Sequence, residues 1–181
     1  MSTSIVLTVI GTDKPGFVQT LSSVLAAHGA SWSKSRMASL AGKFAGILLA
    51  DVPDDETDKV IVALQELGPS GLKVTVERSA MDLSASTYRR VSLDVVGRDR
   101  PNIMHEIVRA LAERGINIVE LTTERLRSST AGTLFHAVVQ VGSPANMPLD
   151  ELRKDLDALA NELMVDILLE ESKPRSVSAL A

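Results

Sequence analysis

A short loop motif occurs twice in the sequence and contains the residues best suited to binding chemistry. One copy runs from Val9 to Phe17 and the other from Val95 to Ile103, and both contain the pattern Gly-x-Asp-x-Pro. In each copy an apolar strand pattern leads through the motif into an amphipathic helix pattern. Backbone N–H groups at a helix start attract anions, and an aspartate beside them would suit an ammonium group. Together they describe a site for a zwitterion.

Each residue of the motif also has a structural interpretation. Glycine permits a sharp turn or close approach to a ligand, aspartate can cap a helix, and proline suits the first helical turn. A helix cap without a ligand is therefore an open alternative, although retention of the motif in both copies favours a site. The candidate loop residues are Gly11, Asp13, Pro15 and Gly16 in the first copy and Gly97, Arg98, Asp99, Pro101 and Asn102 in the second.

Other polar residues near the motif have alternative roles. Ser31 and Asn117 begin the strand pattern that follows each helix, where their side chains can hydrogen-bond either a ligand or a turn. Arg98 and Arg100 flank Asp99 and could form a phosphate clamp. The aspartate between them opposes a dianion, so solvated surface charge is the preferred interpretation of both arginines.

No pattern for catalysis or metal binding is found. The chain has no cysteine, which excludes thiolate zinc sites, iron–sulfur clusters and cysteine nucleophiles. His28, His105 and His136 show neither metal-ligand spacing nor a serine–acid partnership. We expect no catalytic residue, no metal and no cofactor.

Composition limits the partners. The formal net charge is −4 and aromatic residues make up 3% of the chain, whereas nucleic-acid binding needs a basic surface or exposed stacking aromatics. The N-terminus lacks a signal-peptide pattern, and no apolar run approaches the roughly 20 residues of a membrane span. We expect a cytoplasmic protein that contacts neither nucleic acid nor membrane directly.

The whole chain follows the repeat of the motif. Adding 86 to the numbers of Gly11, Asp13 and Pro15 gives Gly97, Asp99 and Pro101. Several apolar residues of the strand and helix patterns also recur, with the same residue type, 86 positions later. Strand and helix patterns follow the order β-α-β-β-α-β in each copy. We predict two domains, 1–79 and 90–171, joined by a linker at 80–89 and followed by a flexible tail at 172–181. Beyond the first helix the register is expected to slip by about four residues.

This order predicts a fold. A βαββαβ module of this length forms an α+β, ferredoxin-like sandwich, with both helices on one face of a four-stranded antiparallel sheet. Ile10, Ile47, Val96 and Val138 should then lie on the opposite face and give it apolar content. That uncovered face predicts self-association into a homodimer or larger assembly.

The two motif regions, Gly97 to Ile118 and Gly11 to Ser31, resemble the ACT domain, the small amino-acid-sensing module of metabolic regulation. Two such domains without a catalytic or DNA-binding domain resemble the glycine cleavage system transcriptional repressor family. The resemblance implies a non-catalytic regulator that binds glycine or a similar small amino acid and controls a DNA-binding activator by protein–protein contact. The alternative is a regulatory subunit that binds and tunes an enzyme of amino-acid metabolism.

The resemblance also implies which residues bind the ligand. The family's ligand residues lie in the strand-to-helix loop and at the start of the second strand. In this chain they correspond to Gly11, Asp13, Ser31, Gly97, Asp99 and Asn117. The copies differ, since Asn102 stands where the first copy has Gly16 and Ser31 stands where the family has asparagine. The second copy is the favoured site because it retains Asn117 where the first copy has Ser31.

Overall fold

The computed structural model describes residues 1–79, 88–128, 132–144 and 148–171. The chain divides into two compact units, Met1–Asp82 and Leu83–Ala181, here called the first and second unit. Most of the expected linker and the whole expected tail, 172–181, lie outside the described residues. The expected linker is too long at its end, because Tyr88 and Arg89 already belong to a strand that is paired in register.

The first unit has the predicted order of elements. They are β1 (Ser2–Thr12), α1 (Phe17–Ala27), β2 (Ser31–Leu40), β3 (Lys43–Pro53), α2 (Thr57–Gln65), the 3₁₀ turn η1 (Gly68–Ser70) and β4 (Leu72–Arg78). The sheet is antiparallel with strand order β2-β3-β1-β4.

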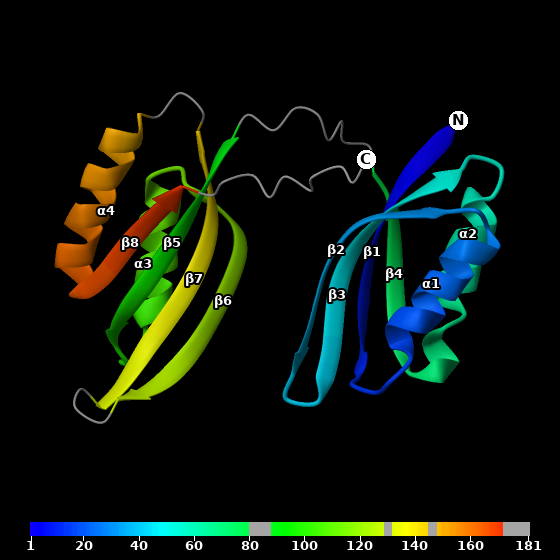
Figure 1. The fold of residues 1–181 in the computed structure, drawn as a ribbon, viewed down its shortest axis with the longest axis horizontal. Coiled ribbons are helices and arrows are strands. Elements are labelled where there is room, and N and C mark those ends of the chain that lie inside the picture. The colour runs from blue at the N-terminus through cyan, green and yellow to red at the C-terminus, as the bar shows by residue number, and fades with distance from the viewer. Residues whose placement is uncertain (80–87, 129–131, 145–147, 172–181) are drawn as a thin grey trace, which may run out of the picture. The chain divides into compact units, whose positions relative to one another are not determined.

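The second unit repeats this arrangement. Its elements are β5 (Tyr88–Arg98), α3 (Ile103–Glu113), β6 (Asn117–Ser128), β7 (Gly132–Pro144), α4 (Leu149–Leu163) and β8 (Val165–Glu171). The strand order is β6-β7-β5-β8, and both helices cover one face of the sheet, as in the first unit (Figure 1). The predicted fold class, tandem ferredoxin-like sandwiches, is confirmed.

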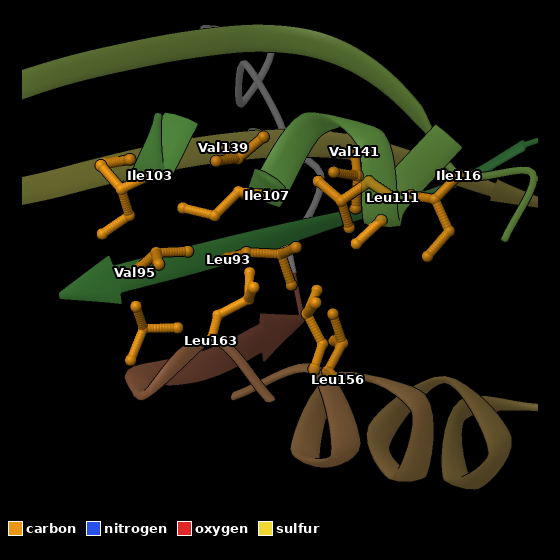
Figure 2. Packing of buried hydrophobic residues seen from close by; sticks show 14 of the residues in the cluster. Leu93, Val95, Ile103, Ile107, Leu111, Ile116, Val139, Val141, Leu156 and Leu163 are labelled. Carbon is orange, nitrogen blue, oxygen red and sulfur yellow. The ribbon is translucent and has the colours of Figure 1, made fainter. Parts of the chain in front are cut away.

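Each core lies between the sheet and its two helices. In the second unit the alternate β5 residues Val91, Leu93 and Val95 are buried, and α3 faces them with Ile107 and Leu111 (Figure 2). A period of two in the strand and of about 3.6 in the helix brings these side chains onto facing surfaces. The core therefore holds β5 rigidly, and with it the loop that follows β5.

The opposite faces of the two sheets differ. In the first unit Ile10 and Ile47 are 51% and 48% exposed. In the second unit Val96 and Val138 are half-buried beside polar side chains on the same face. Leu168, which pairs with Asp94 on this face, is 66% exposed, so both units carry the expected apolar content.

The slip in the repeat register lies in the longer second hairpin, as expected, and is one residue larger than expected. The bulge between Trp32 and Lys34 in β2 recurs between Ile118 and Glu120 in β6, still 86 residues later. The shift appears only in the next strand, where Phe44 corresponds to Phe135, 91 residues later. The slip is therefore five residues, and it lies within the hairpin. The expected turn at 128–132 falls largely on 129–131, outside the described residues.

Candidate functional site

The residue directly before each helix that follows the repeated motif has left-handed backbone geometry. Gly16 precedes α1 with φ 99°, and Asn102 precedes α3 with φ 68°. Glycine adopts this conformation without strain, and asparagine tolerates it better than most other residues. The difference between Gly16 and Asn102 thus preserves the same loop shape in both copies.

The aspartates do not occupy the cap positions of these helices, which argues against the alternative that the motif is only a helix cap. The cap position belongs to Gly16 and Asn102, neither of which makes a side-chain cap hydrogen bond. Pro15 and Pro101 precede the caps, so they lie outside the first helical turn where we expected them. The aspartates are set further back and are free of a capping role.

The first glycine of each motif allows close packing. A Cβ atom on Gly11 would lie 2.6 Å from the carbonyl oxygen of Gly71, and one on Gly97 would lie 2.6 Å from Cγ1 of Val165. Gly71 comes directly before β4, the last strand of the first unit, and Val165 begins β8, the last strand of the second unit. The structure therefore gives these glycines a packing role within the sheet.

Asp99 lies at the loop in a defined electrostatic setting. Its backbone N–H donates to the carbonyl of Thr133 at 3.1 Å. Its carboxylate Oδ2 lies 3.1 Å from Nε of Arg125, with the Asp99 side chain 19% exposed and the Arg125 side chain 76% exposed. A largely covered carboxylate and an accessible guanidinium therefore stand side by side.

Asp13 has the matching backbone position but a neutral partner. Its N–H donates to the carbonyl of Gly42 at 2.9 Å, and its carboxylate accepts a hydrogen bond from the hydroxyl of Ser39. Ser39 lies 86 residues before Arg125, at the same place in the hairpin. The two loops thus share their shape and differ in charge.

Arg100 is not the solvated charge that the sequence suggested. Its guanidinium donates to both carboxylate oxygens of Glu106, at 3.0 and 2.6 Å, and to the carbonyl of Leu163 at 3.3 Å. The hydrogen bonds raise the pKa of Arg100 and lower the pKa of Glu106. Lys14 similarly donates to the carbonyl of Ser70. Arg100 therefore fixes the loop to α3 and to the end of α4, which weakens the phosphate-clamp alternative.

Arg98 remains exposed at the end of β5. It borders a cavity of about 540 Å³ together with Asn161 and Asp166. That cavity includes neither Asp99 nor Asn102.

Ser31 and Asn117 lie far from the loops within their own units. Ser31 pairs with Asp51, which pairs with Ser4, whereas the first loop follows Thr12. Eight residues of strand separate those positions, roughly 26 Å at the usual rise per residue. Asn117 is placed equivalently, through Gly142, in the second unit. A single unit therefore does not bring the loop residues and these two polar residues together.

A groove of about 460 Å³ lies beside the second loop, between the start of α3 and the hairpin of β6 and β7. It is lined by Asp99, Arg100, Pro101, Asn102, Ile103, Met104, Thr123, Glu124, Arg125 and Phe135. Three of the predicted site residues, Asp99, Pro101 and Asn102, thus line one space. Of the first-copy candidates, the structure places Asp13, Pro15 and Gly16 on the loop after β1, and Gly11 near the end of β1 itself.

Comparison with known proteins identifies the family. The family model described as the ACT domain matches residues 3–77 and 90–170. The chain belongs to the ACT domain family. The first and second units are its first and second ACT domains, and ACT domains are regulatory modules.

Individual relatives agree with this assignment. A solved protein of unknown function from Galdieria sulphuraria is 33% identical, with a TM-score of 0.82, over 96% of this chain and 100% of that one. The structure of a candidate glycine cleavage system transcriptional repressor has a TM-score of 0.72 at 21% identity, over 94% of this chain and 97% of that one, and shows the shared fold. A UPF0237 protein of Methanococcus maripaludis is 35% identical over 77 residues, 41% of this chain and 86% of its own.

Sequence reasoning missed the hairpin side of the groove in the second ACT domain. Arg125, Thr123 and Phe135 come from β6 and β7, and their approach to the loop follows from strand pairing. The repeat could have pointed to Arg125, because its counterpart in the first domain is Ser39. Each of these residues contacts the motif aspartate of its own domain, Asp99 and Asp13 respectively. The change from serine to arginine marks where the two copies diverge in chemistry.

Sequence reasoning also missed the partners of the histidines. In the second ACT domain Nδ1 of His136 lies 3.0 Å from Glu124, and Nε2 lies 3.1 Å from Asp94. These contacts raise the pKa of His136, the hydrogen bond to Glu124 contributing most. In the described ranges no cluster of His, Asp and Glu has the arrangement of a metal site, and no helix there has the length and apolar composition needed to cross a bilayer.

Proposed function

We propose that the second ACT domain binds a free amino acid in the groove beside Asp99 and that the protein is a non-catalytic regulator. The observation that carries this proposal is the Asp99–Arg125 pair, in which opposite charges 3.1 Å apart face one groove. A free amino acid carries the complementary ammonium and carboxylate on one carbon. Charge-assisted hydrogen bonds to both groups would be the strong contacts of the complex.

Each charge of the ligand has an assigned partner. The ammonium would donate to the Asp99 carboxylate, and the ligand carboxylate would accept from Arg125. The first N–H groups of α3, which have no partner within the helix, would add to the carboxylate contact. Gly97, Pro101 and Asn102 would shape this loop, with Arg98 at its edge.

Asn117 has a separate place in the proposal. It begins β6 at the end of the sheet opposite Asp99, so it would contact the ligand from a second copy of the chain. Ligand binding would then depend on self-association. The first loop, with Gly11, Asp13, Pro15, Gly16 and, from a second copy, Ser31, would form a weaker site because Ser39 replaces the cation.

The regulatory output would be a protein contact. The likeness to the candidate glycine cleavage system transcriptional repressor supports a role in transcription. The partner in this proposal is a DNA-binding activator, the signal is glycine or a similar amino acid, and the place is the cytoplasm. Co-purification of the full chain from cell extract, with and without added amino acids, tests this. Recovery of a transcription factor in an amino-acid-dependent manner is the expected result. Recovery of an amino-acid metabolic enzyme would contradict it and favour the regulatory-subunit alternative.

A further inference from the structure

We infer that the groove of the second ACT domain selects an amino acid with an apolar side chain of the leucine class over glycine. This inference rests on the proposed amino-acid site beside Asp99 and departs from that proposal in one respect, since it names a larger apolar amino acid in place of glycine. The groove measures about 460 Å³, and cavities that hold drug-sized ligands span roughly 300–1,000 Å³. Glycine has no side chain, so it would leave the space beyond the Asp99–Arg125 pair unfilled.

The inner wall of the groove is apolar. Phe135 and Ile103 are 8% and 4% exposed, and Met104 packs against the same core cluster. Phe135 lies directly across from Arg125 in the pairing of β6 with β7. A ligand held by the ion pair would therefore have apolar surface next to its α-carbon, and covering that surface with a hydrocarbon side chain removes it from water.

The first ACT domain has larger side chains at the corresponding positions. The rings of Phe17 and Phe44 lie 6.1 Å apart, where the second domain has Ile103 and Phe135. Met37 lies over Gly46, with its Cγ 2.6 Å from the place a Cβ would take. The first domain thus has less room at this position, and its motif aspartate contacts the hydroxyl of Ser39 where the second domain has the guanidinium of Arg125.

The groove residue Thr123 has a much larger counterpart, Met37, in the first domain. Thr123 lines the groove and pairs with Ala137, as Met37 pairs with Gly46 in the first domain. Replacing Thr123 by methionine would bring the larger side chain of the first domain into the groove. Thr123 is exposed, so this substitution leaves the core untouched.

Calorimetric titration of the full chain with glycine, valine and leucine tests the inference. We expect leucine to bind at least about tenfold more tightly than glycine, because its isobutyl group covers the apolar wall. Thr123→Met should weaken leucine binding about tenfold more than it weakens glycine binding. The matched variant Met37→Thr should change neither affinity.

The outcomes separate this inference from the proposed function. Glycine binding as tightly as leucine, or leucine binding that ignores Thr123→Met, would overturn the inference and leave an amino-acid site in place. Failure of all three amino acids to bind would overturn the proposed function and the inference together. Thermal melting of Thr123→Met confirms that the variant is folded in each titration.

Discussion

At the residue scale the two loops show how one substitution changes the chemistry of a repeated motif. Asp13 and Asp99 occupy the same backbone position, and each contacts the same place in the neighbouring hairpin. A serine hydroxyl there only satisfies the carboxylate, whereas the guanidinium of Arg125 adds a positive charge that faces solvent. The second loop therefore pairs its carboxylate with a positive charge that can complement a zwitterion, whereas the carboxylate of the first loop contacts a neutral hydroxyl.

His136 provides a prediction on pH. Its pKa is raised by Glu124 and Asp94, so the folded state binds the proton more tightly than the unfolded state, where the pKa is about 6.5. The resulting stabilisation is fully present below that unfolded pKa and is lost as the pH rises through the folded one. His136→Asn should therefore cost more stability at about pH 5.5 than at about pH 8.5, as measured by urea denaturation of parent and variant.

The quantity compared at the two pH values is the difference in the free energy of unfolding between parent and variant, because other groups titrate in both proteins. A destabilisation by His136→Asn that is equal at both pH values would contradict the ion-pair account of this histidine.

At the element scale, the strands and helices were largely predictable and their starting geometry was not. The strand and helix patterns gave the order of elements in each copy, because periodicity reports which face is buried. The positions of Asp13 and Pro15 suggested a cap and a first helical turn. The left-handed residue at Gly16 sets the helix start two residues beyond Pro15, and a sequence motif does not reveal that angle.

Asn102 tests this view of the helix start. Its φ of 68° strains residues with a Cβ, although asparagine tolerates it. Asn102→Ala should lower the free energy of unfolding by about 1 kcal/mol, while Asn102→Gly, which reproduces the first domain, should retain the stability of the parent. Urea denaturation of the three proteins measures both. Equal loss in the alanine and glycine variants would show that the asparagine side chain, and not the backbone angle, matters.

At the scale of the whole molecule, the repeat predicted the architecture but only half of the candidate site. The 86-residue offset located both loops, both helices and the fold. The groove depends on how β6 pairs with β7, and the change to a 91-residue offset occurs inside the hairpin. Arg125, Thr123 and Phe135 reach the loop through that pairing, so contacts between strands decided what the linear motif left open.

Self-association is the prediction that belongs to this scale. Ile10 and Ile47 are exposed on the outer sheet face, and β2 and β6 are edge strands with unpaired backbone groups. Light scattering of the full chain at micromolar concentration should report a dimer or a larger assembly. The variant Ile10→Lys, Ile47→Glu should shift the protein toward the monomer if the apolar face is the contact. A monomeric parent would contradict the expected assembly.

The central claim is that Asp99 holds the ammonium of a free amino acid, and calorimetric titration of Asp99→Asn tests it most directly. The change keeps the shape of the side chain and removes its charge, so binding should weaken by roughly 1–3 kcal/mol, the scale of a charge-assisted hydrogen bond. Stability should change by less than about 1 kcal/mol, because Arg125 is largely exposed and surface ion pairs contribute little. Asp13→Asn is the matched control and should leave the main binding event intact. If Asp99→Asn melts like the parent and binds amino acids with the parent's affinity, the loop is structural and the account is contradicted.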